Sequence, residues 1–448
     1  TQSFHSAQNL LNKYYAGRAN PIDLEKTKIK IIKMCIARAN DERFQLANKY
    51  LELEDLLEIG KRMIGTGLIG GKSVGMIVAQ AILRRKNSYW TKRLEVHDSF
   101  FIGSDVFYTY LVSNKIWWER RKTSSVKNFM TDIEKVREKM ERGNFPEHII
   151  NQFQELLNYF GQSPIIVRSS SLLEDAYGNA FSGKYESVFL ANQGTPKDRL
   201  AQFIDAIRRI YTSTIDKDAL VYRKVRGLLD KDEQMALLVQ RVSGRLYGQY
   251  YFPQIAGVGF SFNPFVWDPR INPKSGFIRL VFGLGTRAVE RTEDDYTRIV
   301  ALNKPTFRPE HSREEIQKFS QKKVDVIDIN ANKNTSKRFE DVVQNQPLIP
   351  LDIFANFDDI LHHELTQRGR TNIFTWYLTF GNLLEKSSFP KDMEEILSIL
   401  EKAYGNPVDI EFTGNFRSID EYQINLLQCR PFQVKQENPT IESLGKIS

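Results

Sequence analysis

The spacing of apolar residues predicts a largely helical first half of the chain. Apolar residues that recur every three or four positions give a helix one buried face, whereas a short apolar run suits a buried strand. By this pattern residues 1–60 are helical, and further helices are expected at 73–85, 131–142, 147–160 and from Pro196 through Tyr211. Short apolar runs predict strands at 100–102, 165–167 and 235–242.

The second half is richer in strands. They are expected at 257–262, 277–282, 324–329, 408–412 and 422–428. One helix is expected over 391–404, ended by Gly405, because glycine is favoured just past a helix C-terminus. The rest of 303–347 is polar, and no repeat period is present. This mixture predicts an α/β or mixed α+β fold, not a helical bundle or a solenoid.

Composition narrows the functional classes. A chain of 448 residues is long enough for two or three domains, and 41% hydrophobic with 26% charged residues is a normal globular balance. The net charge of +8 suits a cleft for polyanions as well as a nucleic-acid surface. Dense Lys/Arg tracts and zinc-finger, homeodomain or RNP-type patterns are missing from the sequence, so we expect no nucleic-acid partner.

The sequence also bears on location. No stretch is long and apolar enough to span a bilayer, and no signal-peptide pattern is present, so we expect no membrane association. Cys35 and Cys429 lie far apart and match no metal spacing. A reducing, cytoplasmic environment is therefore expected. Because the chain begins with Thr1 and not with Met, we expect it to be processed or excised from a longer polypeptide.

Gly70-Gly71-Lys72-Ser73 stands at the start of a predicted helix. Backbone N–H groups at a helix N-terminus bind anions, and a neighbouring lysine adds a positive charge. A P-loop is excluded, since that motif needs a glycine where Thr66 stands. Two interpretations remain from the residues alone: a phosphate-binding loop, or a glycine turn between two helices.

A second segment, 164–171, is a strand that we expect to end in Arg168 and three serines, followed by Glu174 and Asp175. A guanidinium and hydroxyls at a strand end lie where ligands of open sheets gather. The alternative is an ordinary strand exit whose arginine pairs with Glu174 or Asp175.

A third segment is a predicted hairpin that carries Asp409, Glu411, Gln428 and Arg430. Alternation puts Asp409 and Glu411 on one face of their strand. A carboxylate and an amide oxygen on neighbouring strands can hold Mg²⁺, which takes its other ligands from water and phosphate. Arg430, two residues after Gln428, points the same way. The alternative is a polar surface hairpin, which the apolar residues around 424–427 disfavour.

These motifs, in this order, resemble the ATP-grasp nucleotide-binding domain of the phosphoenolpyruvate synthase and pyruvate phosphate dikinase family (the PEP/pyruvate-binding domain). Rifampicin phosphotransferase and the glucan water dikinases share this domain. The resemblance runs from about residue 60 to 433. The segments that carry it are Gly70-Gly71-Lys72, Val167-Arg168-Ser169-Ser170 with Glu174-Asp175 and Phe181-Ser182-Gly183, Gly257-Val258-Gly259-Phe260-Ser261, Gly283-Leu284-Gly285, Asp409-Ile410-Glu411 and Gln428-Cys429-Arg430-Pro431.

The resemblance implies two cofactors, ATP and Mg²⁺, and a role for each matching residue. Lys72 and Arg168 would bind the ATP phosphates, and Arg430 would hold the terminal phosphoryl group; these three are the implied catalytic residues. Glu411 and Gln428 would coordinate Mg²⁺. The remaining implied contacts are with the nucleotide: Gln240, Arg241, Val242 and Ser243 along the adenine, and Gly257, Gly283 and Gly285 through their backbones.

The chain departs from the family pattern in four respects. Val242 stands where methionine is common in the family. Thr286 stands where the family usually has a glutamate after Gly283-Leu284-Gly285; Glu290, Glu293 or Asp294 are candidate substitutes. Residues 1–60 have no counterpart in the resemblance. None of the six histidines lies in the threonine- and glycine-rich setting of the family's phosphohistidine domain, and the phosphoenolpyruvate-binding barrel is missing.

The expected protein is therefore an ATP-grasp-like module that binds nucleotide in a cleft between two subdomains. We divide the chain into a helical extension (1–60), an N-terminal subdomain (61–240), a C-terminal subdomain with the Mg²⁺- and phosphate-binding hairpin (241–435), and a tail or linker (436–448). The expected activity is phosphoryl transfer from ATP to a histidine on a separate domain or partner, through which pyruvate or phosphoenolpyruvate could take part. The alternatives are a stand-alone small-molecule phosphotransferase and a non-catalytic nucleotide sensor.

Overall fold

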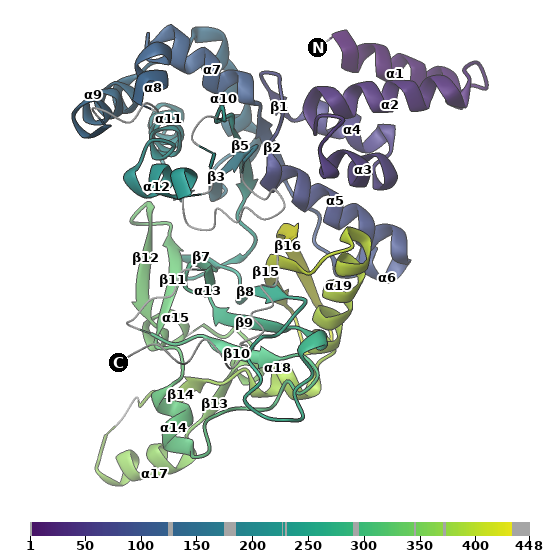
Figure 1. Ribbon diagram of the computed structural model, residues 1–448. Coiled ribbons are helices and arrows are strands. Elements are labelled where there is room, and N and C mark those ends of the chain that lie inside the picture. Colours follow the sequence, from purple (N-terminus) through teal and green to yellow (C-terminus); the bar gives the residue numbers. More distant parts are fainter. Residues whose placement is uncertain are drawn as a thin grey trace, which may run out of the picture.

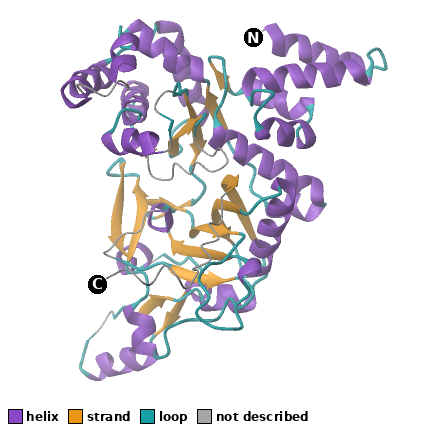
Figure 2. Ribbon diagram, in the orientation of Figure 1, coloured by secondary structure: helices purple, strands orange, loops and turns teal. Residues whose placement is uncertain are grey.

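The structure, a computed structural model, describes residues 2–123, 129–173, 185–225, 227–228, 231–289, 295–344, 346–370 and 373–431. Strands run through the middle of the molecule to its left edge, and helices lie mainly at its top and along its right side (Figure 2). The predicted mixed α/β fold is confirmed. In the part of the chain that the structure describes, no helix is long and apolar enough to cross a membrane.

The first sheet is built from strands of the first half of the chain and is antiparallel except for its β1–β2 pair. In spatial order its strands are β1 (Met63–Ile64), β2 (Ser99–Ile102), β5 (Met235–Arg241), β3 (Ile165–Ser171) and β4 (Ser187–Leu190). Helices of the same half accompany it: α7 (Ser104–Ser113), α8 (Trp117–Thr123), α9 (Phe129–Arg142), α10 (Glu147–Phe160), α11 (Pro196–Ser213) and α12 (Lys217–Val225).

Helix α11 shows how local sequence sets these elements. Thr195 and Asp198 form a capping box around its first turn, and Pro196 occupies the first helical position. On its apolar face Phe203 and Ile207 are fully buried, and Leu200 and Ile204 are partly buried, in the core shared with the first sheet. The helices predicted at 131–142, 147–160 and from Pro196 are therefore confirmed.

The second sheet is antiparallel and contains the predicted hairpin. Its spatial order is β10 (Arg298–Ala301), β9 (Phe277–Phe282), β8 (Ile255–Phe260), β15 (Val408–Phe416) and β16 (Tyr422–Pro431). The register places Glu411 opposite Gln428 and Asp409 opposite Arg430, with an irregularity between Glu411 and Phe412. Ile410, Phe412, Leu426 and other apolar side chains of β15 and β16 are buried, so the hairpin is part of the core and not a surface hairpin.

Two smaller sheets and several short helices complete this half. The small sheets contain β12 (Lys333–Arg338), β11 (Lys323–Asp328), β7 (Tyr250–Phe252) and β6 (Arg245–Tyr247), and β13 (Ala355–Phe357) with β14 (Trp376–Leu378). The helices are α13 (Thr286–Val289), α14 (Arg313–Lys318), α15 (Phe339–Val343), α16 (Leu351–Phe354), α17 (Asp359–Gln367), α18 (Gly381–Lys386) and α19 (Phe389–Tyr404), with a 3₁₀ turn at Pro273–Ser275.

The helical N-terminus packs beside α5, as Figure 1 shows. Its helices are α1 (Gln2–Tyr15), α2 (Pro21–Cys35), α3 (Glu42–Tyr50) and α4 (Leu53–Lys61), followed by α5 (Gly71–Lys86) and α6 (Ser88–Arg93). One hydrophobic core runs from α1–α4 through α5 to β15, β16 and α19. The extension therefore shares a core with the nucleotide-binding motifs, while the predicted domain boundaries at 60, 240 and 435 stay predictions.

One strand prediction was too short. The strand expected at 165–167 continues through Ser171, so Arg168 and the three serines lie inside β3 and not at its exit. Ser169, Ser170 and Ser171 pair with β5 and are fully buried. Small side chains are needed here because α5 approaches this part of the strand closely. Glu174, Asp175 and the segment 180–183 lie outside the described residues.

Candidate nucleotide-binding site

The start of α5 fits directly against β3, and glycine makes this approach possible. A Cβ placed on Gly70 would lie 1.5 Å from the carbonyl oxygen of Ser170, and the Gly70 φ of +83° is itself favoured only by glycine. The Ser73 backbone N–H donates to Ser170 Oγ (3.1 Å). Gly70 therefore allows a tight contact between helix and strand, and Lys72 at the start of α5 donates through its Nζ to Ser169 Oγ on β3 (3.3 Å).

Arg168 reaches from β3 across to the hairpin. Its guanidinium forms an ion pair with the Glu411 carboxylate and donates through Nη2 to Gln428 Oε1 (3.2 Å). Nη1 donates more weakly to the Leu427 carbonyl (3.4 Å). Arg168 thus links the two sheets through the pair of residues that the sequence assigns to Mg²⁺.

Arg430 is oriented by a second carboxylate on the same hairpin. Its Nε lies 2.7 and 2.9 Å from the two oxygens of Asp409, its register partner on β15. Both side chains are largely buried. A charge-assisted contact of this kind fixes the direction of the guanidinium plane.

The charge of Glu411 is set by opposing effects. Burial raises the pKa of its carboxyl, but the positive charges of Arg168, Lys72 and Arg430, together with the Arg168 hydrogen bond, outweigh it and hold the pKa below its ordinary value. Glu411 is therefore ionised at neutral pH. The three cations outnumber the two carboxylates, Glu411 and Asp409, so the local net charge is positive, which suits a polyanion.

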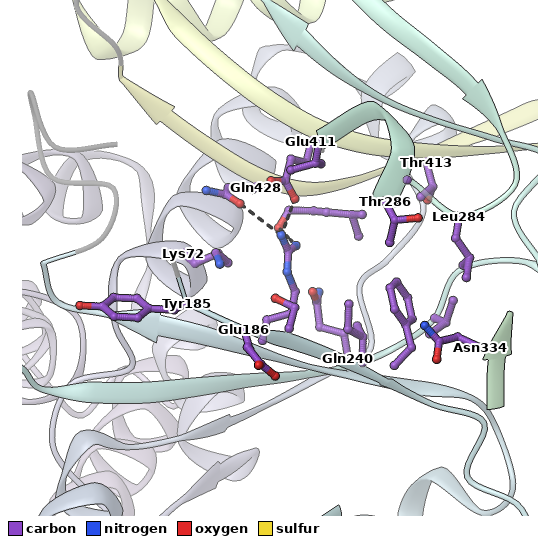
Figure 3. Close-up of a pocket in the computed structure, with 18 of the residues that line it drawn as sticks. Lys72, Tyr185, Glu186, Gln240, Leu284, Thr286, Asn334, Glu411, Thr413 and Gln428 are labelled. Atoms are coloured by element: carbon purple, nitrogen blue, oxygen red, sulfur yellow. Dashed lines mark hydrogen bonds and ion pairs between the residues drawn. The ribbon is translucent and has the colours of Figure 1, made fainter. Parts of the chain in front are cut away.

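One cavity of about 840 Å³ is lined by Lys72, Arg168, Glu411, Gln428 and Arg430. Figure 3 shows Lys72, Gln428 and Glu411 toward one end and Leu284 and Asn334 toward the other. The sequence-predicted residues on its lining are Lys72, Arg168, Gln240, Arg241, Val242, Ser243, Gly257, Gly285, Glu411, Gln428 and Arg430. Segments up to 358 positions apart, from Lys72 to Arg430, are thus brought together.

An apolar cluster lies next to the end of β5, at the end of the cavity that holds Leu284 (Figure 3). Ile166, Phe189, Val242 and Leu284 pack together there and line the cavity. This lining offers flat, water-excluding walls to a planar ring.

Gln240 and its neighbours are held in place by several contacts. Gln240 Nε2 donates to Ser99 Oγ (3.2 Å), while its Oε1 is buried without a hydrogen-bond partner among the described residues. Arg241 is held by Asp98 (2.9 Å), and the Val242 N–H donates to the Pro164 carbonyl (2.9 Å). The end of β5 is thus rigid on the sheet side of the cavity.

Gly283 was expected to contact the nucleotide through its backbone, but it does not line the cavity. A Cβ on Gly283 would be 2.5 Å from Val324 Cγ1 and 2.8 Å from the Asp325 carbonyl oxygen. Its φ of +95° also requires glycine. Gly283 therefore serves the close packing of its turn against β11, whereas Gly257 and Gly285 do line the cavity.

Thr286, at the position of the missing glutamate, lines the cavity and donates its hydroxyl proton to Asp325. Asp325 is held in turn by Arg287 (3.1 Å). The candidate substitutes Glu290, Glu293 and Asp294 lie outside the described residues. Among the described residues, the Thr286 hydroxyl lines the cavity at this point, with the Asp325 carboxylate directly behind it.

Several lining residues were not anticipated from the sequence. They are Tyr185, Glu186 and Phe189 on or beside β4, Asn334 on β12, and Thr413 on β15. Only Thr413, on the same face as Glu411, could have been found by extending the strand alternation. Asn334 lies on β12, which has no apolar residue to mark a strand, whereas the short apolar run Val188-Phe189-Leu190 on β4 could have been recognised as one.

The residues present fit Mg²⁺. Glu411 and Gln428 face each other across the hairpin and both offer oxygens. Within the described ranges no group of three or more His, Cys, Asp or Glu residues could form a metal cage. Mg²⁺ does not need one, because it keeps waters and takes phosphate oxygens. The Arg168 guanidinium now bridges the same two oxygens, which shows that they accept a cation.

Comparison with known proteins agrees with this geometry. A family model described as "Pyruvate phosphate dikinase, AMP/ATP-binding domain" matches residues 66–445. A curated relative, the "Uncharacterized phosphotransferase YvkC" of Bacillus subtilis (strain 168), is 26% identical over 319 residues, which is 69% of this chain and 30% of the relative. The chain thus spans less than a third of that relative's length.

Proposed function

Since this chain belongs to the family of pyruvate phosphate dikinase AMP/ATP-binding domains, we propose that it binds Mg·ATP in the cavity and passes a phosphoryl group to a histidine on a separate domain or partner. The family and the phosphotransferase relative support an ATP-binding phosphotransferase module in general. The ATP-grasp mechanism, the histidine acceptor and a link to pyruvate or phosphoenolpyruvate are the specific parts of the proposal.

Each side chain has a defined task in this proposal. Lys72 and Arg168 bind the phosphates, and Arg430, held by Asp409, contacts the terminal phosphoryl group. Glu411 and Gln428 would hold Mg²⁺, which neutralises phosphate charge when it is bound. These groups act by positioning and charge neutralisation and form no covalent bond to the phosphoryl group.

One observation carries the proposal. Lys72, Arg168 and Arg430 come from a helix start, a strand of the first sheet and a strand of the second sheet, yet all line one cavity around an ionised Glu411. Three cations and a carboxylate–amide pair match the needs of a metal-bound polyphosphate. The apolar end beside Val242 provides room for the base.

The acceptor is proposed to lie outside this chain. No histidine lines the cavity among the residues that the structure describes. His362 and His363 lie on α17, at the lower tip of the molecule in Figure 1. A cytoplasmic location is part of the proposal, and the two buried free thiols of Cys35 and Cys429 are consistent with it.

The test uses ATP labelled separately at the β- and γ-phosphates, with and without a phosphohistidine domain of this family supplied in trans. We expect slow hydrolysis by the chain alone and fast transfer of label to the added histidine. Rapid transfer to a small molecule without that domain would favour the stand-alone phosphotransferase. Tight binding with no turnover under either condition would favour a nucleotide sensor, a candidate that Thr286 in place of a carboxylate supports.

A further inference from the structure

A second cavity, of about 390 Å³, opens beside β10, the edge strand of the second sheet. It shares no lining residue with the cavity around Glu411. Phe265, Trp267, Phe319 and Phe380 form most of its aromatic wall. The first three of these side chains are 44%, 37% and 39% exposed, so the wall opens to solvent.

Three charged residues lie in this aromatic wall: Arg298, Arg308 and Glu310. Both Nη atoms of Arg298 already donate to backbone carbonyls, Nη1 to Ile299 (2.9 Å) and Nη2 to Pro305 (3.3 Å) and Phe307 (2.8 Å), and its Nε is buried without a hydrogen-bond partner. Arg308 donates through Nη2 to the Thr379 carbonyl, and no hydrogen bond of its Nε or Nη1 is found within the described residues. Glu310 Oε2 is also buried and unpartnered. Among the described residues, neither arginine lies within ion-pair distance of a carboxylate.

Buried charged atoms without partners are costly and uncommon. The cavity around Glu411 has atoms in the same condition, namely Arg168 Nε, Gln240 Oε1 and Thr413 Oγ1. Burial, with the nearby Arg308 charge, lowers the pKa of Arg298 to about 9. This cavity therefore resembles a binding site in its polar groups as well as in its shape.

We propose that this second cavity binds a free aromatic amino acid or another small zwitterion that carries an aromatic ring, a carboxylate and an ammonium group. Arg308 receives the carboxylate through the guanidinium N–H groups that Thr379 does not occupy, because a guanidinium fork matches carboxylate geometry, and Arg298, held by backbone carbonyls, adds its positive charge. Glu310 accepts a hydrogen bond from the ammonium group. The ring lies against Trp267, Phe265 and Phe319, which supply aromatic contacts.

The size and polarity of the cavity agree with this ligand class. Its volume is at the small end of the range of about 300–1,000 Å³ that is usual for small-molecule sites. Two cations facing one carboxylate match a ligand that carries both charges. A nucleotide matches this pattern less well, since it has no ammonium group to offer Glu310. The proposal is independent of the function assigned to the first cavity.

The test is calorimetric titration of the protein with L-phenylalanine, 3-phenylpropionate and phenethylamine. The two analogues lack the ammonium and the carboxylate, respectively. We expect L-phenylalanine to bind. Each analogue should bind at least roughly tenfold more weakly, because each loses one charge-assisted hydrogen bond. Saturating Mg·ATP should not displace L-phenylalanine.

Variants connect the binding to the named residues. Glu310→Gln, Arg308→Met and Trp267→Ala should each weaken L-phenylalanine binding roughly tenfold. Arg368→Met and Trp118→Ala, exposed matched controls, should not. All five variants should keep the circular dichroism spectrum and the cooperative thermal unfolding of the wild-type chain, which shows that they are folded. The proposal is overturned by absence of L-phenylalanine binding, by equal binding of either analogue, by displacement with Mg·ATP, or by unchanged binding in Glu310→Gln.

Discussion

Arg168 and Glu411, 243 positions apart in the sequence, form an ion pair that joins the two sheets across the cavity. Arg168 also donates to Gln428, so one guanidinium bridges both oxygens assigned to the metal. A divalent cation and this guanidinium would compete for the same two oxygens. Binding of Mg·ATP is therefore expected to move Arg168 from Glu411 onto phosphate.

Glu411→Gln tests the metal pair. The substitution keeps the size and one acceptor oxygen but removes the negative charge, so it should abolish the Mg²⁺-dependent gain in ATP affinity, about tenfold or 1.4 kcal/mol. Metal-free nucleotide binding should remain largely intact. Calorimetric titrations with Mg²⁺ and with EDTA measure both quantities.

The control is Glu421→Gln, which removes a carboxylate from an exposed pair with Arg417. Exposed pairs contribute little, and this variant should behave like the wild type. Normal Mg²⁺-dependent affinity and turnover in Glu411→Gln would show that the metal pair is misassigned.

Gly70→Ala tests the contact between α5 and β3. The added Cβ would clash with the Ser170 carbonyl oxygen, so the free energy of unfolding should fall by more than about 4 kcal/mol, the size of exceptional single substitutions. Gly17 has a similar positive φ of +71° but nothing within 4 Å of its added Cβ. Gly17→Ala should therefore cost only about 1–2 kcal/mol of backbone strain. Urea denaturation compares the two; similar losses would mean that the clash is relieved by a small shift.

His97 predicts an acid-sensitive contribution to stability. Burial, with the charges of Arg84 and Arg62, lowers its pKa from 6.5 to about 4. Below pH 6.5 the His97 imidazole binds a proton in the unfolded chain but stays neutral in the folded chain. The free energy of unfolding therefore falls as the pH falls toward 4. From about pH 7 to pH 5 the loss should be about 2 kcal/mol.

His97→Gln should remove this loss, because glutamine does not titrate and can still bond to Ser99, which lies 3.1 Å from His97 Nδ1. Denaturation of both proteins at the two pH values measures the difference. If both lose the same stability, His97 already titrates normally in the folded state.

Much of the fold could be predicted from local sequence. The buried face and cap of α11, the glycine that ends α19 and the alternation along β15 and β16 are properties of neighbouring residues. The sequence of β12, Lys-Asn-Thr-Ser-Lys-Arg, has no apolar residue and mostly exposed positions, so no periodicity marks it. Asn334 was missed for this reason, although it lines the cavity.

The pairing of site residues was harder to predict than their identity. Motif resemblance selected Arg168, Glu411 and Gln428, but the direct contact of Arg168 with both others depends on how two sheets meet. Local patterns also placed Arg168 at a strand end, because three serines have low strand propensity. Their pairing with β5 and the contact with α5 override that propensity.

Mg·ATP binding at Lys72 is the central claim, and thermal denaturation with and without nucleotide tests it most directly. At 100 times the dissociation constant, Mg·ATP should stabilise the wild-type chain by about 2.7 kcal/mol through mass action. Lys72→Met keeps the buried stem but removes the charge, so it should show a smaller shift at the same nucleotide concentration. No shift of the well-folded wild-type chain with millimolar Mg·ATP, or an equal shift in Lys72→Met, would contradict the account.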